Sequence, residues 1–349
     1  MAYSNNIGPA NSIELRVNML TSIMDEVIAH DVKTSAMTPN SAMVQATSEA
    51  NKFKIATART QGLGTYSKTF GYPMGKAELS WEEYTLRYDR SRGFMLDNID
   101  IRQSGGLASA TYMMSEFMRQ DVIPEIDCLR IAGVAQRAIA LNADNGVVYD
   151  QALTKANVLS SIRTGLNSIF QHFHTRTGNL IYMDYALKPA LEASSEFQYV
   201  RQVSGAGSSV DMWIDAIDGN SIVWMPSDYM KTAFDLNDGN TTGQEEGGVK
   251  PASTAKSINF LITAPGVANG IVSVQSEKFI PKENNILADA DFIALRLYHD
   301  VIVMKEKGPG LYLSVKESER GDEPVETGVA KYSAPSTAKA TTRTTTKTI

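Results

Sequence analysis

The sequence predicts a mixed α+β fold, and three observations indicate it. The turn Asp218-Gly219-Asn220 lies between two alternating apolar segments, which is the pattern of a β-hairpin. A helical pattern runs from Leu107 to about Ala140. The last third of the chain contains several short apolar segments of the kind found in strands. Together these signals predict strands and helices within one globular chain.

The composition excludes several kinds of protein. The 349 residues, 43% hydrophobic and 21% charged, suit about two domains or one elaborated domain. Cys128 is the single cysteine, which excludes a disulfide framework and a four-cysteine zinc site. The formal charge of −6 argues against general attraction to nucleic acid or anionic membranes. Long apolar runs are absent and the first residues are polar, so we expect neither a membrane span nor a signal peptide.

The N-terminal part changes character several times. Apolar residues spaced by three and four predict an amphipathic helix over Ile13 to Ile28, followed by an extended arm from Lys33 to Asn51. Lys52 to Lys76 is basic, rich in glycine and free of acids, so it should be disordered or ordered by a partner. Glu78 to Asp100 is mainly acidic. Adjacent blocks of opposite charge suit contact between copies of the chain.

The next segment combines strands with the long helix. Alternation from Tyr84 to Asn98 predicts a hairpin, with Asp89 to Gly93 as its turn. The helical pattern that begins at Leu107 contains Pro124, which lacks a backbone N–H and should kink or divide the helix.

The second half of the chain predicts another block of helices and strands. Thr154 is a candidate N-cap for a helix with an apolar face from Val158 to Phe173. The polar residues from Asp235 to Lys256 predict a long mobile loop. The Thr-rich end, Ser333 to Ile349, has the composition of a disordered tail. The remaining expected elements are strands at Leu180 to Met183, Ile258 to Ile262, Ile271 to Val274, Phe292 to Tyr298, Val301 to Met304 and Leu311 to Val315, and a short helix at Ala186 to Ala193.

Residue patterns that carry catalysis are missing from the sequence. Gly62 to Thr69 departs from a phosphate-binding loop, because Ser67 stands where the glycine before Lys68 is required. His172 and His174 are two residues apart, which points them to different faces of a helix and is wrong for a shared metal. We therefore predict no catalytic, cofactor-binding or metal-binding residues, and a protein that is not an enzyme.

The order of these features and the amino-acid sequences of several segments resemble those of the major capsid proteins of tailed bacteriophages, of the Hong Kong 97 type. The resemblance covers roughly Lys52 to Val315. The segments that carry it are Trp81 to Phe94, Leu96 to Asp100, Phe117 with Val122 to Asp127, Asp218 to Ser227, and Arg296 to Asp300 continuing to Tyr312.

The resemblance implies a Hong Kong 97-like capsid fold and a division of the chain. Residues 1–50 would form an N-terminal arm, and residues 51–83 an extended β-hairpin loop that lies across a neighbouring subunit. Residues 84–140 and 291–316 would form a peripheral domain with a long spine helix. Residues 141–290 would form an axial α/β domain, and residues 317–349 a C-terminal extension.

The resemblance also implies a function. The chain would be a structural protein of the virion that assembles, in the cytoplasm of a bacterial host, into the hexamers and pentamers of an icosahedral phage head. The head would enclose double-stranded DNA without binding it sequence-specifically, and the protein would have no membrane partner. Further partners would be a portal and a decoration protein. Because only about fifty residues precede the loop and the chain starts at Met1, we expect a separate scaffolding protein or none. Lys68 and Lys76 lie in the loop that is cross-linked in some members, but no pattern identifies a partner Asn or Glu.

Two alternatives stay open at this point. An encapsulin-like shell of a bacterial nanocompartment would have a similar fold and would be distinguished by a protein cargo in place of DNA. A soluble enzyme with an unrecognised site would be distinguished by one pocket with perturbed titrating groups.

Overall fold

The computed structural model describes residues 32–37, 44–46, 51–69, 71–103, 110–149, 151–194, 200–202, 212–214, 216–285 and 288–316. The helix predicted over Ile13 to Ile28 and the tail from Ser333 to Ile349 lie outside these residues.

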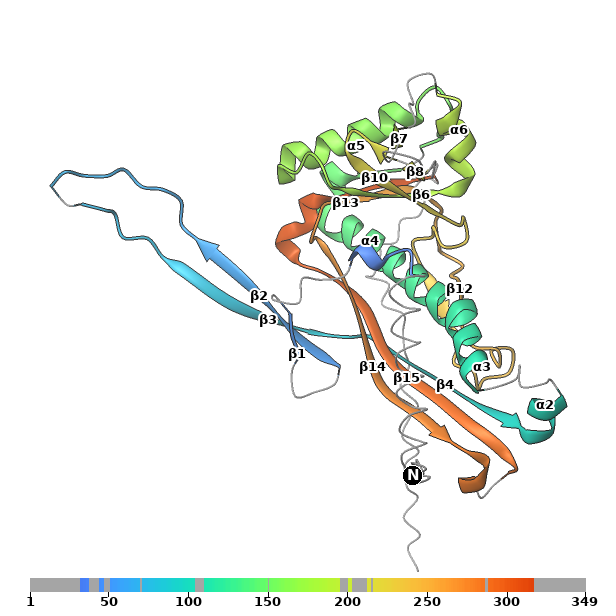
Figure 1. Ribbon diagram of the computed structural model, residues 1–349. Helices are drawn as coiled ribbons and strands as arrows, with labels where there is room; N and C mark the ends of the chain where they lie inside the picture. Colours follow the sequence, from blue (N-terminus) through green and yellow to red (C-terminus); the bar gives the residue numbers. More distant parts are fainter. Residues whose placement is uncertain are drawn as a thin grey trace, which may run out of the picture.

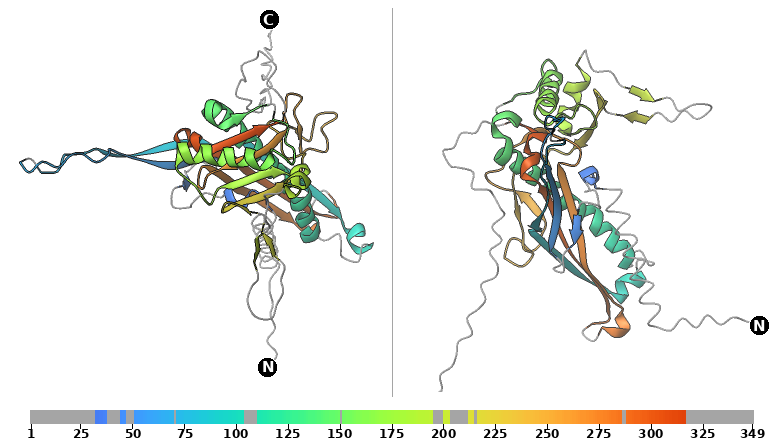
Figure 2. Two further views of the ribbon diagram at one scale, coloured as in Figure 1. Left: turned by 90° about the horizontal axis from the view of Figure 1, so that it is seen from above. Right: turned by 90° about the vertical axis from the view of Figure 1, so that its left-hand side faces the viewer.

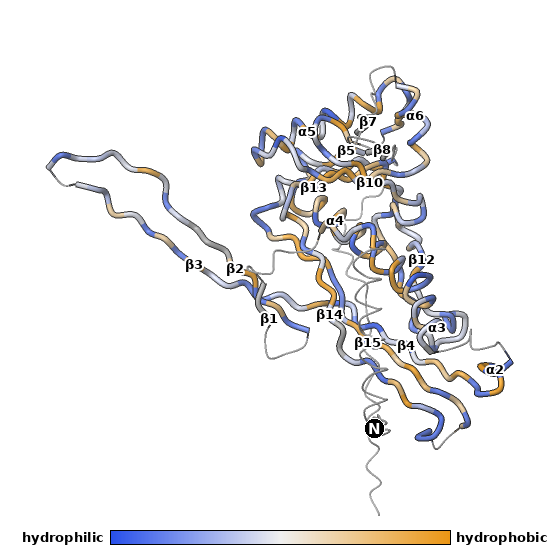
Figure 3. Tube along the Cα trace, viewed as in Figure 1, coloured by the Kyte–Doolittle hydropathy of each residue, from blue (hydrophilic) through white to orange (hydrophobic). Residues whose placement is uncertain are grey.

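The described chain forms two lobes joined by a long helix, and one hairpin projects far from both (Figure 1; Figure 2). We call them the six-stranded lobe and the three-stranded lobe, after their sheets. Apolar residues concentrate along the strands of both lobes and on the helix between them (Figure 3). This mixed arrangement of helices and antiparallel-rich sheets confirms the predicted α+β class.

The six-stranded lobe contains most of the strands predicted for the second half of the chain. Helix α5 (Val158–Phe173) packs closely on its sheet, because a Cβ at Gly165 would lie 2.7 Å from the Tyr312 ring. The hairpin turn at Asp218 and Gly219 is confirmed, with φ of 50° and 78°. The strand order is β5 (Val147–Val148), β16 (Leu311–Val315), β13 (Ile258–Thr263), β6 (Leu180–Asp184), β10 (Asn220–Met225) and β9 (Ala216–Ile217), and the 3₁₀ turn η4 (Tyr185–Leu187) with helix α6 (Lys188–Glu192) follows β6.

The start of α5 differs from the prediction. The expected cap, Thr154, lies one turn before the helix, whose N-cap is Asn157. The Asn157 side-chain oxygen accepts hydrogen bonds from the Thr154 N–H and hydroxyl, so these residues close a turn of their own. The predicted apolar face is confirmed, since Val158, Ile162 and Ile169 are buried with most of their neighbours on it.

The three-stranded lobe is a twisted antiparallel sheet of β14 (Ala268–Ile280), β15 (Ala290–Val303) and β4 (Tyr88–Asp97). The hairpin predicted over Tyr84 to Asn98 is wrong, because its expected turn lies inside β4 and pairs with β15. Gly93 serves packing and not a turn: a Cβ there would lie 3.1 Å from the Phe292 ring. The two short strands predicted at Phe292 to Tyr298 and Val301 to Met304 form one strand, β15, because β14 pairs with it on both sides of His299.

Strand pairing also differs from the predicted division of the chain in two places. The boundary expected between residues 290 and 291 separates β14 from β15, although these strands pair from Ala268 to Ile280. The end of the segment 291–316 belongs to β16, which pairs with β13 in the six-stranded lobe. Both differences have one cause: pairing joins segments distant in sequence, so a division by sequence ranges cannot follow it.

The long helix is divided near Pro124, as predicted. Helix α3 (Ala110–Phe117) continues through a π-helical turn (Met118–Val122) into α4 (Ile123–Gly146), where the proline lies in the first turn. The backbone stays helical through this point, since the Ile123 N–H still bonds to the Met118 carbonyl, so the proline, which has no N–H, lies where the π-helical pattern changes to the α-helical one. Helix α4 packs its first turns on the three-stranded lobe through Ile126 and its later turns on the six-stranded lobe through Val134, so it belongs to both cores.

The segment predicted as a long mobile loop contains a small sheet of β11 (Phe234–Leu236) and β12 (Val249–Pro251). Arg90 of β4 donates hydrogen bonds to the carbonyls of Asn237 and Gly248, which fastens the loop to the three-stranded lobe. The other short elements are η1 (Ser35–Met37), α2 (Asn98–Gln103), the pair β7 (Val200–Gln202) and β8 (Met212–Ile214), η5 (Lys282–Asn284) and η6 (Lys305–Gly310).

Candidate assembly surfaces

The projecting hairpin consists of β2 (Lys52–Thr60) and β3 (Ala77–Thr85), joined by residues 61–76. The strands pair along their full length, and β1 (Val44–Ala46) adds a third strand at the base. The remainder extends away from both lobes (Figure 1; Figure 2). A two-stranded hairpin without a covering layer is at best marginally stable in water, so this one needs a surface to lie on.

The distal part of the hairpin exposes apolar side chains. It carries six of the thirteen large apolar residues that are exposed in the described part of the chain. Near the turn, Tyr66 and Tyr72 pack edge to face with ring centroids 5.3 Å apart, and Met74 is 99% exposed. The six residues are Leu63, Tyr66, Tyr72, Met74, Leu79 and Trp81, and we call them the hairpin apolar surface. Exposed apolar side chains that gather on one projection indicate a contact with another macromolecule.

The charges of the hairpin pair within one chain. The basic block, which suggested contact between copies, lies on β2 and the turn of the hairpin, and the first part of the acidic block, Glu78 to Glu83, lies on the paired strand β3. Lys52 and Lys54 lie 3.5 and 3.9 Å from Glu83, and Lys76 lies 3.4 Å from Glu78. These pairs are exposed and each contributes about 0–1 kcal/mol, so they set strand register more than stability. The apolar residues are therefore the stronger candidates for an intermolecular contact.

The root of the hairpin is fixed to the lobes by an apolar cluster and an ion pair. Leu86, buried between β3 and β4, packs with Ile55 of the hairpin and Ile302 of β15. The Arg87 guanidinium donates two hydrogen bonds of 2.8 Å to the carboxylate of Asp300, which also accepts from the Arg87 backbone N–H at 3.2 Å. Such a bidentate pair fixes direction as well as distance.

A second apolar surface lies at the opposite end of the molecule. Met95 of β4, Phe292 of β15 and Ile280 of β14 are directly paired neighbours, so they form one row on the outer face of the three-stranded sheet. Met95 is 55% exposed, and Ile99 of the adjoining α2 is 60% exposed. We call this the distal apolar surface. The figure places it and the hairpin tip at opposite ends (Figure 1).

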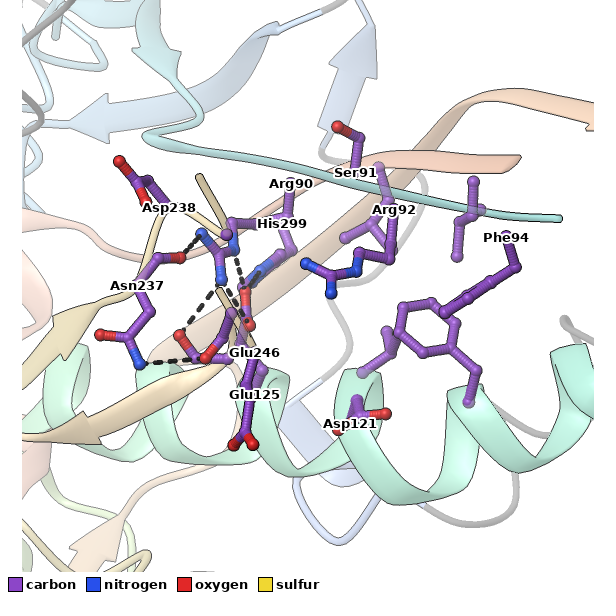
Figure 4. A pocket seen from close by; sticks show the side chains of 17 residues that line it. Arg90, Ser91, Arg92, Phe94, Asp121, Glu125, Asn237, Asp238, Glu246 and His299 are labelled. Carbon is purple, nitrogen blue, oxygen red and sulfur yellow. Dashed lines mark hydrogen bonds and ion pairs between the residues drawn. The ribbon is translucent and has the colours of Figure 1, made fainter. Parts of the chain in front are cut away.

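A pocket lies between the three-stranded lobe, the π-helical turn and the loop from Asn237 to Gly248 (Figure 4). Arg90 crosses it and holds Glu125 of α4 with bonds of 2.6 and 3.1 Å. The buried His299 ring lies 3.6 Å from the same carboxylate and stacks on Tyr88. Burial opposes the charge of Glu125, but His299 and Arg90 together keep its pKa below the usual range. Arg90 and Glu125 join α4, the sheet and the loop, and His299 contacts the same carboxylate through Nε2, while its buried Nδ1 has no hydrogen-bond partner among the described residues. These contacts make the pocket a structural joint.

We expect Glu125→Gln to destabilise the chain by about 1–3 kcal/mol at neutral pH, because it removes a charge-assisted bond from Arg90. The pKa of Glu125 is lower in the folded chain than in the unfolded one. Its contribution is therefore fully present above about pH 4.3 and is lost as the pH falls through the folded value. Urea unfolding between about pH 3 and about pH 7 should show the two proteins converging in acid. The exposed Glu192→Gln of α6 is the control, and a difference that persists unchanged in acid would contradict the assignment.

The residues considered for chemistry lie apart from one another. Burial raises the pKa of the Cys128 thiol to about 12, which is a structural cysteine's environment. Lys68 and Lys76 lie in the turn of the hairpin, and His172 and His174 lie at the end of α5. Within the described residues, no group of three or more His, Cys, Asp or Glu side chains could hold a metal ion. In the same part of the chain, none of the helices combines the length and apolarity that crossing a bilayer requires.

Comparison with known proteins gives no matching family model and no matching curated protein. Solved structures do match. One, described as "Gordonia phage Cozz", has a TM-score of 0.50 at 10% identity and covers 82% of this chain and 87% of that chain. "Capsid structure of the Cyanophage P-SCSP1u" has a TM-score of 0.49 at 10% identity, covering 78% and 85%. A virus-like particle from Pyrococcus furiosus has a TM-score of 0.48 at 8% identity, covering 85% and 98%.

These identities are too low to carry more than the fold. The first match extends over most of both chains, and the mixed helix and sheet architecture is that of Hong Kong 97-like capsid structures. The fold implied by the sequence resemblance is therefore confirmed. The sequence missed the residues that fix the hairpin root, since Arg87 and Asp300 are separated by 213 positions. The exposed aromatic pair Tyr66 and Tyr72 was available as a signal, in a segment that was judged by its charge and its glycine content.

Proposed function

We propose that this chain is a major capsid protein, which assembles into the hexamers and pentamers of a phage head around double-stranded DNA. The hairpin carries the proposal: it is a long two-stranded projection whose large apolar side chains have no covering layer within the described chain. A shell protein gains a contact that reaches past its own lobes.

The placement of the apolar surfaces supports assembly into a closed shell. The hairpin apolar surface and the distal apolar surface are different parts of the chain at opposite ends of it. A contact made by such unlike surfaces is heterologous, and repeated heterologous contacts generate rings when the rotation closes. Rings that also meet through the distal surface build a lattice.

The segments take the roles that the capsid fold suggests, with the strand exchange described above. We assign the hairpin as the extended loop, the three-stranded lobe with α3 and the first turns of α4 as the peripheral domain, and the six-stranded lobe as the axial domain. Residues 1–50 and 317–349 remain an N-terminal arm and a C-terminal extension. The net charge of −6 fits a shell that encloses DNA without binding it tightly. A portal and scaffolding or decoration proteins would be the further partners.

Negative-stain microscopy with light scattering tests the proposal on the purified full-length chain, expressed alone and with neighbouring genes of its source. We expect closed shells, or free pentamers and hexamers. Shells that contain another protein in place of DNA would support the encapsulin-like alternative. A stable monomer or dimer that never assembles under either condition would overturn the proposal.

A further inference from the structure

The short segment Val32 to Met37 crosses the junction between the two lobes. Its first residue, Val32, is 3% exposed and packs in the core of the three-stranded lobe, with Met118 and Ile126. Its last residue, Met37, is 2% exposed and packs in the core of the six-stranded lobe. Six residues therefore contribute one buried side chain to each core. We call this segment the strap.

The strap is held at its centre by a buried carboxylate of α4. Asp127, 1% exposed, accepts hydrogen bonds from the Thr34 hydroxyl at 2.7 Å, from the Thr34 N–H at 3.0 Å and from the Lys33 N–H at 3.2 Å. Arg130, one turn further along α4, donates to the Thr34 carbonyl and hydroxyl at 3.3 and 3.2 Å. Every polar atom of the buried Thr34 that can bond is thus used by the helix that joins the lobes.

The opposite side of this contact is shaped to admit the arginine. The Arg130 guanidinium lies against β14 at Gly270, where a Cβ would be 2.6 Å from it. Arg130 Nε and the nearby Tyr182 hydroxyl of β6 are buried without a hydrogen-bond partner in the described chain. Burying a charge and leaving polar atoms unpaired is costly, so a core that needed only volume here would contain apolar residues. The hydrogen bonds of Asp127 and Arg130 to Thr34 instead specify one position of the strap.

We propose that the strap fixes the angle between the two lobes, and that Asp127 and Arg130 hold it in place through their hydrogen bonds. We call these two residues and their bonds to the strap the lock. The two lobes share α4, β14 and β15, which are continuous elements that can bend. The strap is a further connection between them, made by a segment outside these elements that hydrogen-bonds to side chains of α4, so it can be released without breaking a long helix or a strand of either sheet. Because the lobes carry different assembly surfaces, the angle it fixes decides how one copy meets the next. This inference goes beyond the proposed function, and free subunits suffice to test it.

The experiment measures the distance between the lobes by pulsed electron spin resonance. Spin labels are placed on cysteines introduced at Gln171 of α5 and Lys278 of β14, which are both exposed. The buried Cys128, with its thiol pKa of about 12, should stay unlabelled. We expect one narrow distance distribution in the full-length chain, and a broadened or shifted one in Thr34→Val and in Asp127→Asn. Thr263→Val removes a hydroxyl that is 2% exposed elsewhere in the core and should leave the distribution narrow.

Trypsin reports on the strap itself in the same samples. The bond after Lys33 is held closed by the lock, whereas the bond after Lys155 lies in an exposed turn and is the internal reference. Losing a hydrogen bond to a buried charge should raise the relative rate of cleavage after Lys33 by about tenfold or more. If Thr34→Val and Asp127→Asn fold poorly, Gly270→Ala takes their place. Its methyl group crowds Arg130 from the other side, so it should also raise the rate of cleavage after Lys33. Faster cleavage with an unchanged distance distribution, or no faster cleavage in any variant, would refute the proposal.

Discussion

Replacing Tyr72 and Met74 by aspartate should abolish shell formation while leaving the free subunit folded. The two side chains are 86% and 99% exposed, so the fold of one chain does not depend on them. Burying each against a neighbouring copy would contribute about 1.5–3 kcal/mol, and aspartate would add the cost of a buried charge. The loss of about 3 kcal/mol at each contact weakens it by more than about a hundredfold. Because a shell repeats the contact in every copy, we expect no particles.

Thr65→Asp is the matched control for this experiment. Thr65 lies in the same exposed turn and is not part of the hairpin apolar surface, so it adds charge without removing apolar area. Microscopy should show shells for Thr65→Asp and none for the double variant, with thermal midpoints for both close to that of the unchanged protein. Normal shells from the double variant would show that the hairpin apolar surface is not a principal contact.

Local patterns predicted those elements whose side chains have one environment along their length. The apolar face of α5 is continuous from Val158 to Ile169, β13 and β16 are buried on every residue, and β6 is buried on its three central residues. The Asp218-Gly219 turn was also predictable, because only a few residues adopt its positive φ values without strain. In these places the local preference and the final packing agree.

Pairing over long distances defeated the prediction elsewhere. Strand β4 contains Asp89 to Gly93, whose composition is that of a turn, yet β15 pairs with it from about two hundred residues away. Tertiary contacts override a local turn preference when a partner strand pairs with the whole segment, as β15 does here. The basic segment from Lys52 was misjudged for the same reason, since its partner strand β3 carries the compensating acids.

The surfaces that support the proposed function were only partly visible in the sequence. An apolar residue in a strand is normally read as facing a core, and nothing in the sequence distinguishes Trp81 or Met95 from such a residue. Their exposure becomes apparent only when the sheet that carries them has no layer on that side. Charge, in contrast, is visible in the sequence. The ion pairs of Lys52 and Lys54 with Glu83, and of Lys76 with Glu78, nevertheless lie within one hairpin and do not indicate a contact between copies.

Arg87→Met should destabilise the free subunit by about 3–5 kcal/mol, the largest single loss that we expect. Asp300 is 4% exposed, so removing its partner leaves a carboxylate buried without a counter-charge. Asp300→Asn should cost less, because the Arg87 side chain is 30% exposed and can turn to solvent. Urea unfolding of the unassembled subunits measures both losses.

The double variant Arg87→Met with Asp300→Asn measures the interaction energy of the ion pair apart from the contacts that each residue makes with other groups. With neither charge present, its loss should be well below the sum of the single losses, by about 1–3 kcal/mol. Arg87→Lys keeps the charge but not the two parallel bonds, so it should retain most of the stability while loosening the hairpin. Hydrogen exchange of β2 and β3 would then rise in Arg87→Lys without a matching fall in the unfolding midpoint. If exchange of the hairpin stays unchanged in every Arg87 variant, the ion pair stabilises the lobe alone, and the direction of the hairpin is set by the Leu86 cluster.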